Sequence, residues 1–233
     1  MPKRALIIQN DKPETLGLYE SRLRERAEVA LIHAYEMKPR DKFPSTEAFD
    51  AFIIGPTPIS ANDAHRHSFL RKELEYLRRI IGSGKPTLGV CCGGQMLAKL
   101  QGGEVHSSPR REIGGYTVSL TEDGFRDLLF HGFPQAFPVF QWHQEAFTVP
   151  PGGRLLATGS PCPVQAYAKD NIWGVIFHLE ITEPDARRWA DAYPQEPQAI
   201  GKNRAQVLAE CRESEPRMRA LAERLMDNLI SVA

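Results

Sequence analysis

The stretch PTLGVCCGGQML, residues 86–97, decides how this chain folds, and it holds two of the chain's four cysteines. The residues before the cysteines form a short apolar run typical of a buried strand. Those after them favour a short helix that ends at Gly102 and Gly103. A buried strand that turns sharply into a helix is the setting of a nucleophile elbow, which presents a reactive side chain at the turn. Strand and helix approach closely there, so the residues two before and two after the nucleophile must be small.

Cys91 is the predicted nucleophile, because both flanking positions are glycines, Gly89 and Gly93, whereas Cys92 has Val90 two residues before it. Cys92 is then expected to supply a backbone N–H, at the start of the helix, that stabilises an oxyanion. The positive end of the helix is also expected to lower the pKa of the Cys91 thiol and to favour the thiolate. The alternative is a glycine-rich structural turn with two buried cysteines.

The rest of the chain predicts an α/β fold. In the first half, apolar runs alternate with amphipathic helical patterns, which predicts a parallel sheet covered on both faces. In the second half, strand-like runs follow one another closely with proline and glycine between them, which predicts antiparallel or mixed strands added to the sheet. The predicted strands are residues 5–9, 29–35, 49–55, 86–90, 115–121, 137–143, 154–160, 163–170 and 172–180, and the predicted helices of the first half are residues 14–27, 69–85 and 93–103.

Length and composition predict one domain, residues 1–233, with C-terminal helices over about 184–233 that pack on it and are broken near Pro216. The 29 basic and 29 acidic residues balance, which argues against a nucleic-acid partner or an anionic membrane surface. No pair of cysteines has CxxC spacing, so we expect reduced thiols, no metal site and a cytoplasmic location. No segment has the length and apolarity of a signal peptide or a membrane span.

A histidine and a glutamate near the end of the last predicted strand could complete a catalytic site. His178 and Glu180 are two residues apart, so in an extended chain they face the same side, about 6.6 Å apart by strand rise. A glutamate can cross that gap and accept the imidazole N–H, as the orienting acid of a nucleophile–base–acid triad does. The alternative is a histidine at a strand end beside a surface glutamate.

The stretch at 86–97 together with GVIFHLE, residues 174–180, resembles the class I (triad) glutamine amidotransferases. The resemblance implies a flavodoxin-like fold with an antiparallel extension, and it implies that Cys91 is the nucleophile, His178 the base and Glu180 its partner. It also implies that Gln95 contacts the substrate and that no metal or organic cofactor is needed. Residues 141–159 resemble the same region of stand-alone, GMP-synthase-like members and of γ-glutamyl peptidases.

The loop at residues 55–63 resembles the oxyanion loop of that family but departs from its Gly-Gly-Pro pattern. Because Pro56 and Pro58 lack an N–H, the predicted second oxyanion donor is the N–H of Thr57, with Gly55 as the next choice. Threonine tolerates positive φ poorly, so we expect the loop to differ in shape from the family's.

Gln95, Gly93 and His143 are the predicted substrate-binding residues. His143 has Glu145 two residues on, so this second His-x-Glu pair competes with His178 for the role of base. The family motif favours His178, which leaves His143 on the acceptor side or in a structural role.

The motifs and the family resemblance leave three alternative functions. The chain is expected to be a glutaminase that passes ammonia to an acceptor or a partner synthetase. The first alternative is a hydrolase of γ-glutamyl peptides or conjugates that uses the same residues. The second is a binding or regulatory relative without catalysis.

Overall fold

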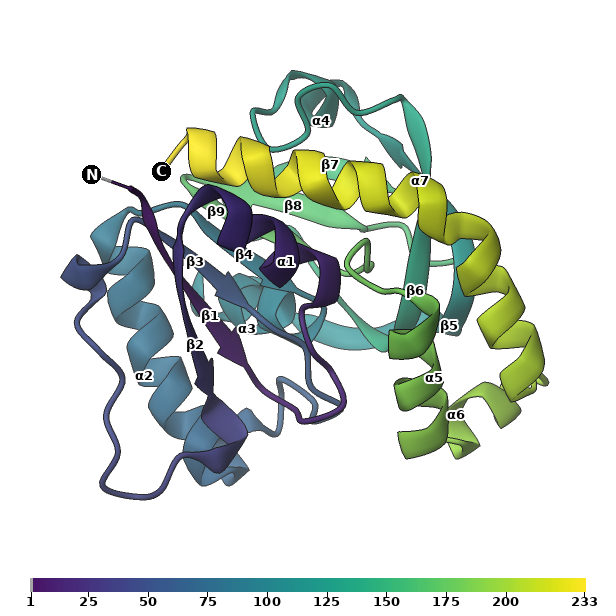
Figure 1. Cartoon of the computed structure of the whole chain (residues 1–233), viewed down its shortest axis with the longest axis horizontal. Helices are drawn as coiled ribbons and strands as arrows, with labels where there is room; N and C mark the ends of the chain where they lie inside the picture. Colours follow the sequence, from purple (N-terminus) through teal and green to yellow (C-terminus); the bar gives the residue numbers. More distant parts are fainter. Residues whose placement is uncertain (1) are drawn as a thin grey trace.

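The computed structural model describes residues 2–233, and over these residues the chain forms a nine-stranded sheet with helices on both faces (Figure 1). The strand order is β2-β1-β3-β4-β9-β8-β7-β5-β6. The first five strands in that order are parallel, and the remaining four run antiparallel to their neighbours. This confirms the α/β fold with an antiparallel extension. The strands are β1 (Arg4–Gln9), β2 (Glu28–His33), β3 (Ala51–Ile54), β4 (Thr87–Val90), β5 (Val105–Leu120), β6 (Ala136–Phe147), β7 (Arg154–Thr158), β8 (Ala166–Lys169) and β9 (Ile172–Val175).

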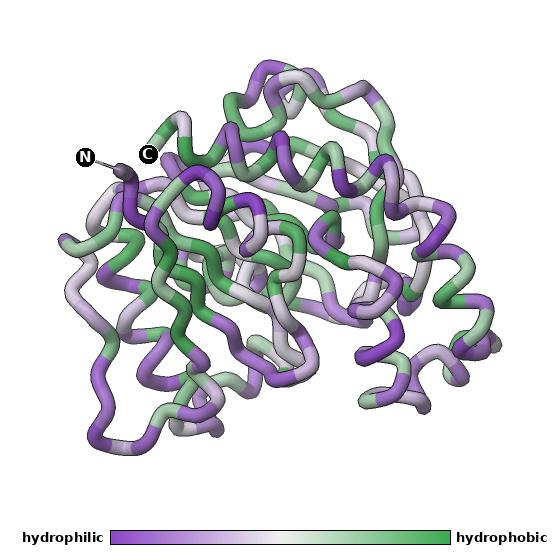
Figure 2. Tube along the Cα trace, viewed as in Figure 1, coloured by the Kyte–Doolittle hydropathy of each residue, from purple (hydrophilic) through white to green (hydrophobic). Residues whose placement is uncertain are grey.

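Two apolar cores lie on opposite faces of the sheet. One core joins the sheet to α1 (Gly17–Arg26), α5 (Glu183–Ala192) and α7 (Arg204–Ser231), and the other joins it to α2 (Ser68–Ser83) and α3 (Cys92–Leu100). Figure 2 shows the matching pattern, with apolar segments inside and polar segments outside. The short elements are α4 (Glu122–Arg126), α6 (Gln195–Gln198) and three 3₁₀ turns, η1 (Ala34–Glu36), η2 (Thr46–Ala48) and η3 (Ala64–Arg66).

The central strands are apolar throughout because both of their sides are covered. Every residue of β3 and of β4 is buried, and five of the six residues of β1 are buried. Buried parallel strands of this kind read as continuous apolar runs rather than as alternating patterns. For this reason the first half of the sheet can be predicted from the sequence.

Helix α7 corrects the prediction of two helical segments broken near Pro216, because one helix runs through the proline. Buried apolar residues continue on both sides of it at helical spacing, from Val207 to Leu229. Pro216 itself is exposed, so its missing N–H and its ring act on the outer side of the helix. The packing of both halves holds α7 together, and the helix curves over the sheet (Figure 1).

Helix α2 contains a charged residue that its apolar pattern did not predict to be internal. Glu73 is fully buried, and its Oε1 accepts a hydrogen bond of 3.0 Å from the amide of Asn10. Burial raises the pKa of Glu73 to about 8. The core that joins the sheet to α2 and α3 therefore contains a carboxyl group that prefers to stay protonated.

The carboxyl ends of β1, β3, β4 and β9 meet at one edge of the sheet, because these strands are parallel. Strand β2 pairs with one edge of β1, and the next strand along the chain, β3, pairs with the other edge. The strand order therefore reverses beside β1. Open α/β sheets bind their ligands outside the carboxyl ends of the strands at such a reversal. Among the described residues, no helix is both long enough and apolar enough to cross a membrane.

Candidate active site

The turn between β4 and α3 places Cys91 at the carboxyl edge of the sheet. Cys91 has φ 50° and ψ −112°, a conformation that L-residues rarely adopt. Its N–H donates to the carbonyl of Val175 at 2.8 Å and its carbonyl accepts from the N–H of Gln95 at 3.0 Å. The strained backbone is therefore fixed from β9 on one side and from α3 on the other.

The glycines beside Cys91 are required by close packing. A Cβ on Gly89 would lie 2.6 Å from the carbonyl carbon of Gly93, and a Cβ on Gly93 would lie 2.3 Å from the carbonyl oxygen of Ile54. Both distances are too short for any real side chain. The structure thus has the tight strand-to-helix turn centred on Cys91 that the sequence predicted.

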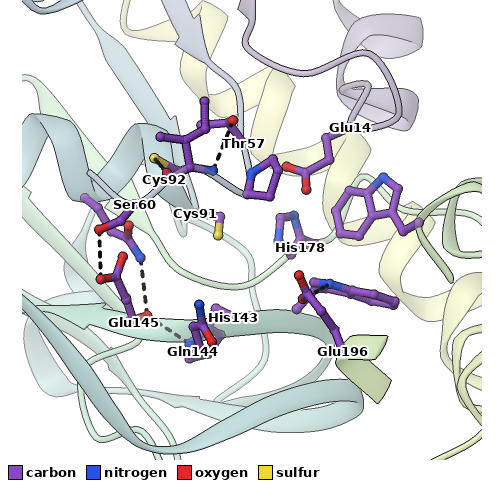
Figure 3. A pocket seen from close by; sticks show the side chains of 15 residues that line it. Glu14, Thr57, Ser60, Cys91, Cys92, His143, Gln144, Glu145, His178 and Glu196 are labelled. Carbon is purple, nitrogen blue, oxygen red and sulfur yellow. Dashed lines mark hydrogen bonds between the residues drawn. The ribbon is translucent and has the colours of Figure 1, made fainter. Parts of the chain in front are cut away.

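The two adjacent cysteines point in different directions. Figure 3 shows the Cys91 sulfur between Glu145 and His178, whereas the Cys92 sulfur points away from them. The Cys92 thiol donates to the carbonyl of Ile59 at 3.3 Å. The backbone N–H of Cys92 is at the first position of α3, where no carbonyl of the helix can accept it.

His178 and Glu180 form a buried acid–imidazole pair. The Nδ1 of His178 lies 2.6 Å from Oε1 of Glu180, and both side chains are almost completely buried. The backbone of His178 is held by paired hydrogen bonds with Phe140 of 2.8 and 2.9 Å, and Trp189 packs edge-on against the imidazole at 4.9 Å. The Nε2 of His178 has no hydrogen-bond partner among the described residues, so it is free toward the cavity that it shares with Cys91 (Figure 3).

The thiol of Cys91 has a pKa well above its usual value, because it is buried and because the carboxylate of Glu14 is close. The N–H of Cys92 acts in the opposite direction but is outweighed. The helix start thus lowers this pKa as expected, but the expectation that the thiolate is favoured is wrong, because burial and Glu14 outweigh it. Burial and neighbouring acids favour the protonated thiol of Cys91.

Two residues of the oxyanion loop, Gly55 and Thr57, were predicted as backbone donors, and in the part of the chain that the structure describes only the N–H of Thr57 is free for that role. The N–H of Gly55 donates to the carbonyl of Ile8 at 2.8 Å, so the structure does not support Gly55 as an oxyanion donor. Thr57 lines the cavity, and its side chain accepts from the N–H of Ile59 at 3.4 Å. The only described non-glycine residues with positive φ are Cys91 and Asp170. Thr57 therefore fits an ordinary backbone conformation, without the strain that the sequence suggested.

The predicted substrate-binding residues separate into two groups. Gln95 lines the cavity and its amide donates to the carbonyl of Glu145 at 3.2 Å. Of the described residues around this cavity, Gly93 is not part of the lining, because it packs on the backbone of β3 instead. Its position supports the turn rather than contact with a substrate.

His143 lies on the cavity wall and has a polar neighbour at each ring nitrogen. Its Nδ1 lies 3.0 Å from the carbonyl of Glu145, which can only accept, so this nitrogen carries a proton. Its Nε2 lies 3.2 Å from Oε2 of Glu112, at ion-pair distance but without the alignment of a hydrogen bond, and both side chains are buried. Glu112, His143 and Cys162 are also the one group of described residues whose geometry could hold a metal ion. His143 and Glu112 thus form a buried acid–base pair, and this contact gives the imidazole of His143 a structural role.

Several cavity residues were not predicted from the sequence. They are Glu14, Ser60, Trp142, Gln144, Trp189 and Glu196. Glu14 follows β1, and acids in loops after parallel strands could have been selected by the rule that ligands bind at the carboxyl edge. Glu196 and Trp189 come from α6 and α5, and nothing in the local sequence indicates that these helices reach the same cavity.

The chain belongs to the class-I glutamine amidotransferase family, whose sequence model matches residues 18–188. Fold and sequence agree on this assignment, and the family consists of enzymes that act on the amide of glutamine. The resemblance read from the sequence is thereby confirmed.

Particular relatives narrow the comparison. The chain is 26% identical to the glutamine amidotransferase-like protein YfeJ of Salmonella typhimurium over 186 residues, which is 77% of this chain and 76% of YfeJ. It is 30% identical to one subunit of the glutamine-hydrolysing GMP synthase of Ignicoccus hospitalis, over 65% of this chain and 76% of that relative. With the GMP synthase of Aeropyrum pernix it shares 38% identity over 43% of this chain, but this segment is only 19% of that protein.

A solved structure matches almost the whole molecule. The glutamine amidotransferase of Thermotoga maritima is 25% identical to the chain and superimposes with a TM-score of 0.88 over 99% of both chains. The fold of this chain is therefore that of a class I glutamine amidotransferase from end to end, C-terminal helices included.

Proposed function

We propose that this protein hydrolyses the side-chain amide of glutamine with Cys91, His178 and Glu180 and supplies the ammonia to an acceptor or a partner synthetase. The observation that carries the proposal is the buried pair of His178 and Glu180, whose free Nε2 shares a cavity with the strained Cys91. The proposed steps need no metal ion or organic cofactor.

The acylation step begins with a neutral thiol. Glu180 accepts a hydrogen bond from the Nδ1–H of His178 and so keeps the lone pair on Nε2, which removes the proton of Cys91 as the sulfur attacks the amide carbon. The oxyanion is stabilised by the backbone N–H groups of Cys92 and Thr57. His178 then protonates the leaving nitrogen, the C–N bond breaks, and a γ-glutamyl thioester remains on Cys91.

Deacylation uses the same groups in reverse. His178 removes a proton from water, the hydroxide attacks the thioester, and the sulfur leaves and is reprotonated. Glutamate is released and the thiol is restored. Gln95 and the backbone of Glu145, which it contacts at 3.2 Å, hold the glutamyl portion throughout.

A partner protein is the simplest acceptor. Relatives that are named as subunits of GMP synthase match this chain over most of their own length, and no ATP-binding motif is recognisable in the sequence. We assign residues 1–233 to one glutaminase unit, since α5 and α7 share the apolar core of α1 and the sheet. The γ-glutamyl peptidase alternative uses the same residues and differs in the group that leaves with the amide nitrogen.

Labelling with a diazo-ketone analogue of glutamine tests the assignment. The wild type and Cys92→Ser should be labelled on Cys91, and Cys91→Ser should show no label by peptide mass spectrometry. Glutamate release should be lost with Cys91→Ser and retained with Cys92→Ser. A label that survives in Cys91→Ser and is lost in Cys92→Ser would exchange the two roles, and unlabelled, inactive wild type would favour the non-catalytic alternative.

A further inference from the structure

The geometry around Cys91 separates the acyl side of the cavity from the leaving-group side. The four bonds of a tetrahedral intermediate point to the sulfur, the oxyanion donors, the leaving nitrogen and the acyl chain. The leaving nitrogen must face His178, since this residue protonates it. Figure 3 shows Ser60 and Glu145 on one side of the Cys91 sulfur, and His178, Glu14 and Glu196 on the other. The acyl chain therefore extends toward Glu145, and a leaving group larger than ammonia extends toward Glu14 and Glu196.

The leaving-group side carries a buried carboxyl group, that of Glu14, beside a hydroxyl donor, Tyr193, which it shares with Asp11. Glu14 is 5% exposed and lines the cavity. The nearby hydroxyl of Tyr193 has a single proton, which it donates to Asp11. Burial and the charges of Asp11, Glu196 and Glu180 raise the pKa of Glu14 well above its usual value. These surroundings favour the protonated form of Glu14 in the free site, and a cation beside it would favour the ionised form.

A second carboxylate and two aromatic side chains complete this side. Oε2 of Glu196 accepts a hydrogen bond of 2.8 Å from the indole of Trp142, which fixes the carboxylate at the rim of the cavity. Trp142 and Trp189 pack edge to face at 5.8 Å, and both line the cavity. Carboxylates beside indole rings are the surroundings in which proteins bind ammonium groups.

Among the described residues of the lining, the acids have no lysine or arginine beside them, and the two histidines already contact other acids, Glu112 and Glu180. The described residues that line the cavity include the three glutamates 14, 145 and 196 and no lysine or arginine. Glu145 is already occupied, because its Oε1 accepts from the hydroxyl of Ser60 at 2.8 Å. The other two acids, Glu14 and Glu196, are on the leaving-group side and have no lysine or arginine partner among the described residues of the lining.

Accepting the proposed Cys91 hydrolysis, on which this step rests, we infer that the leaving-group side binds an ammonium group and that the enzyme cleaves γ-glutamyl amides of diamines. In this reaction the amide nitrogen of the diamine leaves with a proton from His178, and its distal ammonium group stays between Glu14 and Glu196. Water then releases glutamate from the thioester. One amide and one water give one glutamate and one diamine, without an oxidant or a nucleotide.

Three substrates test the inference with the full-length protein. They are the γ-glutamyl amide of 1,4-diaminobutane, the γ-glutamyl amide of n-pentylamine, which replaces the distal ammonium by a methyl group, and glutamine. Glutamate release gives kcat/KM for each. We expect the diamine amide to exceed the pentylamide by about tenfold or more, since a good charge pair in a partly desolvated site is worth about that factor.

Variants locate the preference. Glu14→Gln and Glu196→Gln should each lower the ratio of the two kcat/KM values by about fivefold or more, and free 1,4-diaminobutane should inhibit the wild type more strongly than n-pentylamine does. Asp191→Asn, an exposed acid of α5 paired with Arg204 at 2.6 Å outside this cavity, should leave the ratio unchanged. Glu196 is only half-buried and lies on a short surface helix, so this variant decides the question if Glu14→Gln fails to fold.

The outcomes separate this inference from the proposed function. Equal kcat/KM values for the two amides, or a ratio that both variants leave intact, would overturn the ammonium subsite while Cys91-dependent glutamine hydrolysis still stood. Turnover of all three substrates that persists in Cys91→Ala, or no turnover of any of them, would overturn both.

Discussion

Two buried histidines, each near a glutamate, lie on the wall of the same cavity, and they differ in what their ring nitrogens contact. In both, Nδ1 donates to an oxygen, of Glu180 for His178 and of the backbone for His143. The Nε2 of His143 faces Glu112 at 3.2 Å, whereas that of His178 has neither an ion-pair nor a hydrogen-bond partner among the described residues. The comparison teaches that a His-x-Glu pattern does not identify a base. In the proposed function, the base is the imidazole whose Nε2 is free in the cavity that it shares with Cys91.

The sharpest way to break this comparison is to remove each imidazole. His178→Asn should lower kcat by about 10³–10⁴ or more, because it removes the base and the acid of every proton transfer. His143→Asn should keep most of the turnover and lower the melting temperature, because it leaves Glu112 buried without its partner. Glutamate release and thermal melting measure the two effects. The roles would have to be exchanged if His143→Asn were the inactive variant.

A change in the oxyanion loop should have a second, smaller effect on the turnover assigned to Cys91 and His178. Thr57→Pro should lower kcat by about 10²–10³, because it deletes a backbone donor, whereas Thr57→Gly keeps the N–H and should stay close to wild type. Circular dichroism must show that Thr57→Pro is folded. Near-normal turnover of a folded Thr57→Pro protein would remove Thr57 from the oxyanion hole.

The smallest effect concerns the thiol of Cys91, which His178 deprotonates in the proposed mechanism. Glu14 raises the pKa of Cys91, so Glu14→Gln should lower that pKa and enlarge the thiolate fraction at a given pH. At a pH of about 9 the rate of Cys91 alkylation by iodoacetamide should rise by about three- to tenfold. Asp191→Asn is the matched control and should react at the wild-type rate. An unchanged or slower rate in Glu14→Gln would show that Glu14 does not control the thiol.

Much of this site could be predicted from the sequence, because it depends on residues that are close together in the chain. The parallel strands were predictable because residues buried on both sides leave a continuous apolar pattern, and the turn at Cys91 was predictable because only glycine fits at positions 89 and 93. His178 and Glu180 are two residues apart, so their geometry follows from the chain itself.

Features that depend on contacts between distant segments of the chain could not be predicted from the sequence. Pro216 suggested a helix break, but the packing of α7 on the sheet overrides it. The pKa of Cys91 was expected to fall, because the helix end is local, while the burial and the carboxylate that raise it come from other elements. Glu196 and Trp189 reach the cavity only through the placement of α5 and α6.

The buried carboxyl of Glu73 also makes folding a proton-uptake reaction. Its pKa is about 8 in the folded chain and near 4.5 when exposed, so between these values the folded state binds a proton that the unfolded state has released. The free energy of unfolding contributed by this group is therefore greatest below pH 4.5 and falls as the pH rises toward 8. Neutral buffer keeps more of this contribution than buffer at pH 8 or above, so alkaline conditions that increase the thiolate fraction of Cys91 weaken this one contribution to the stability of the fold.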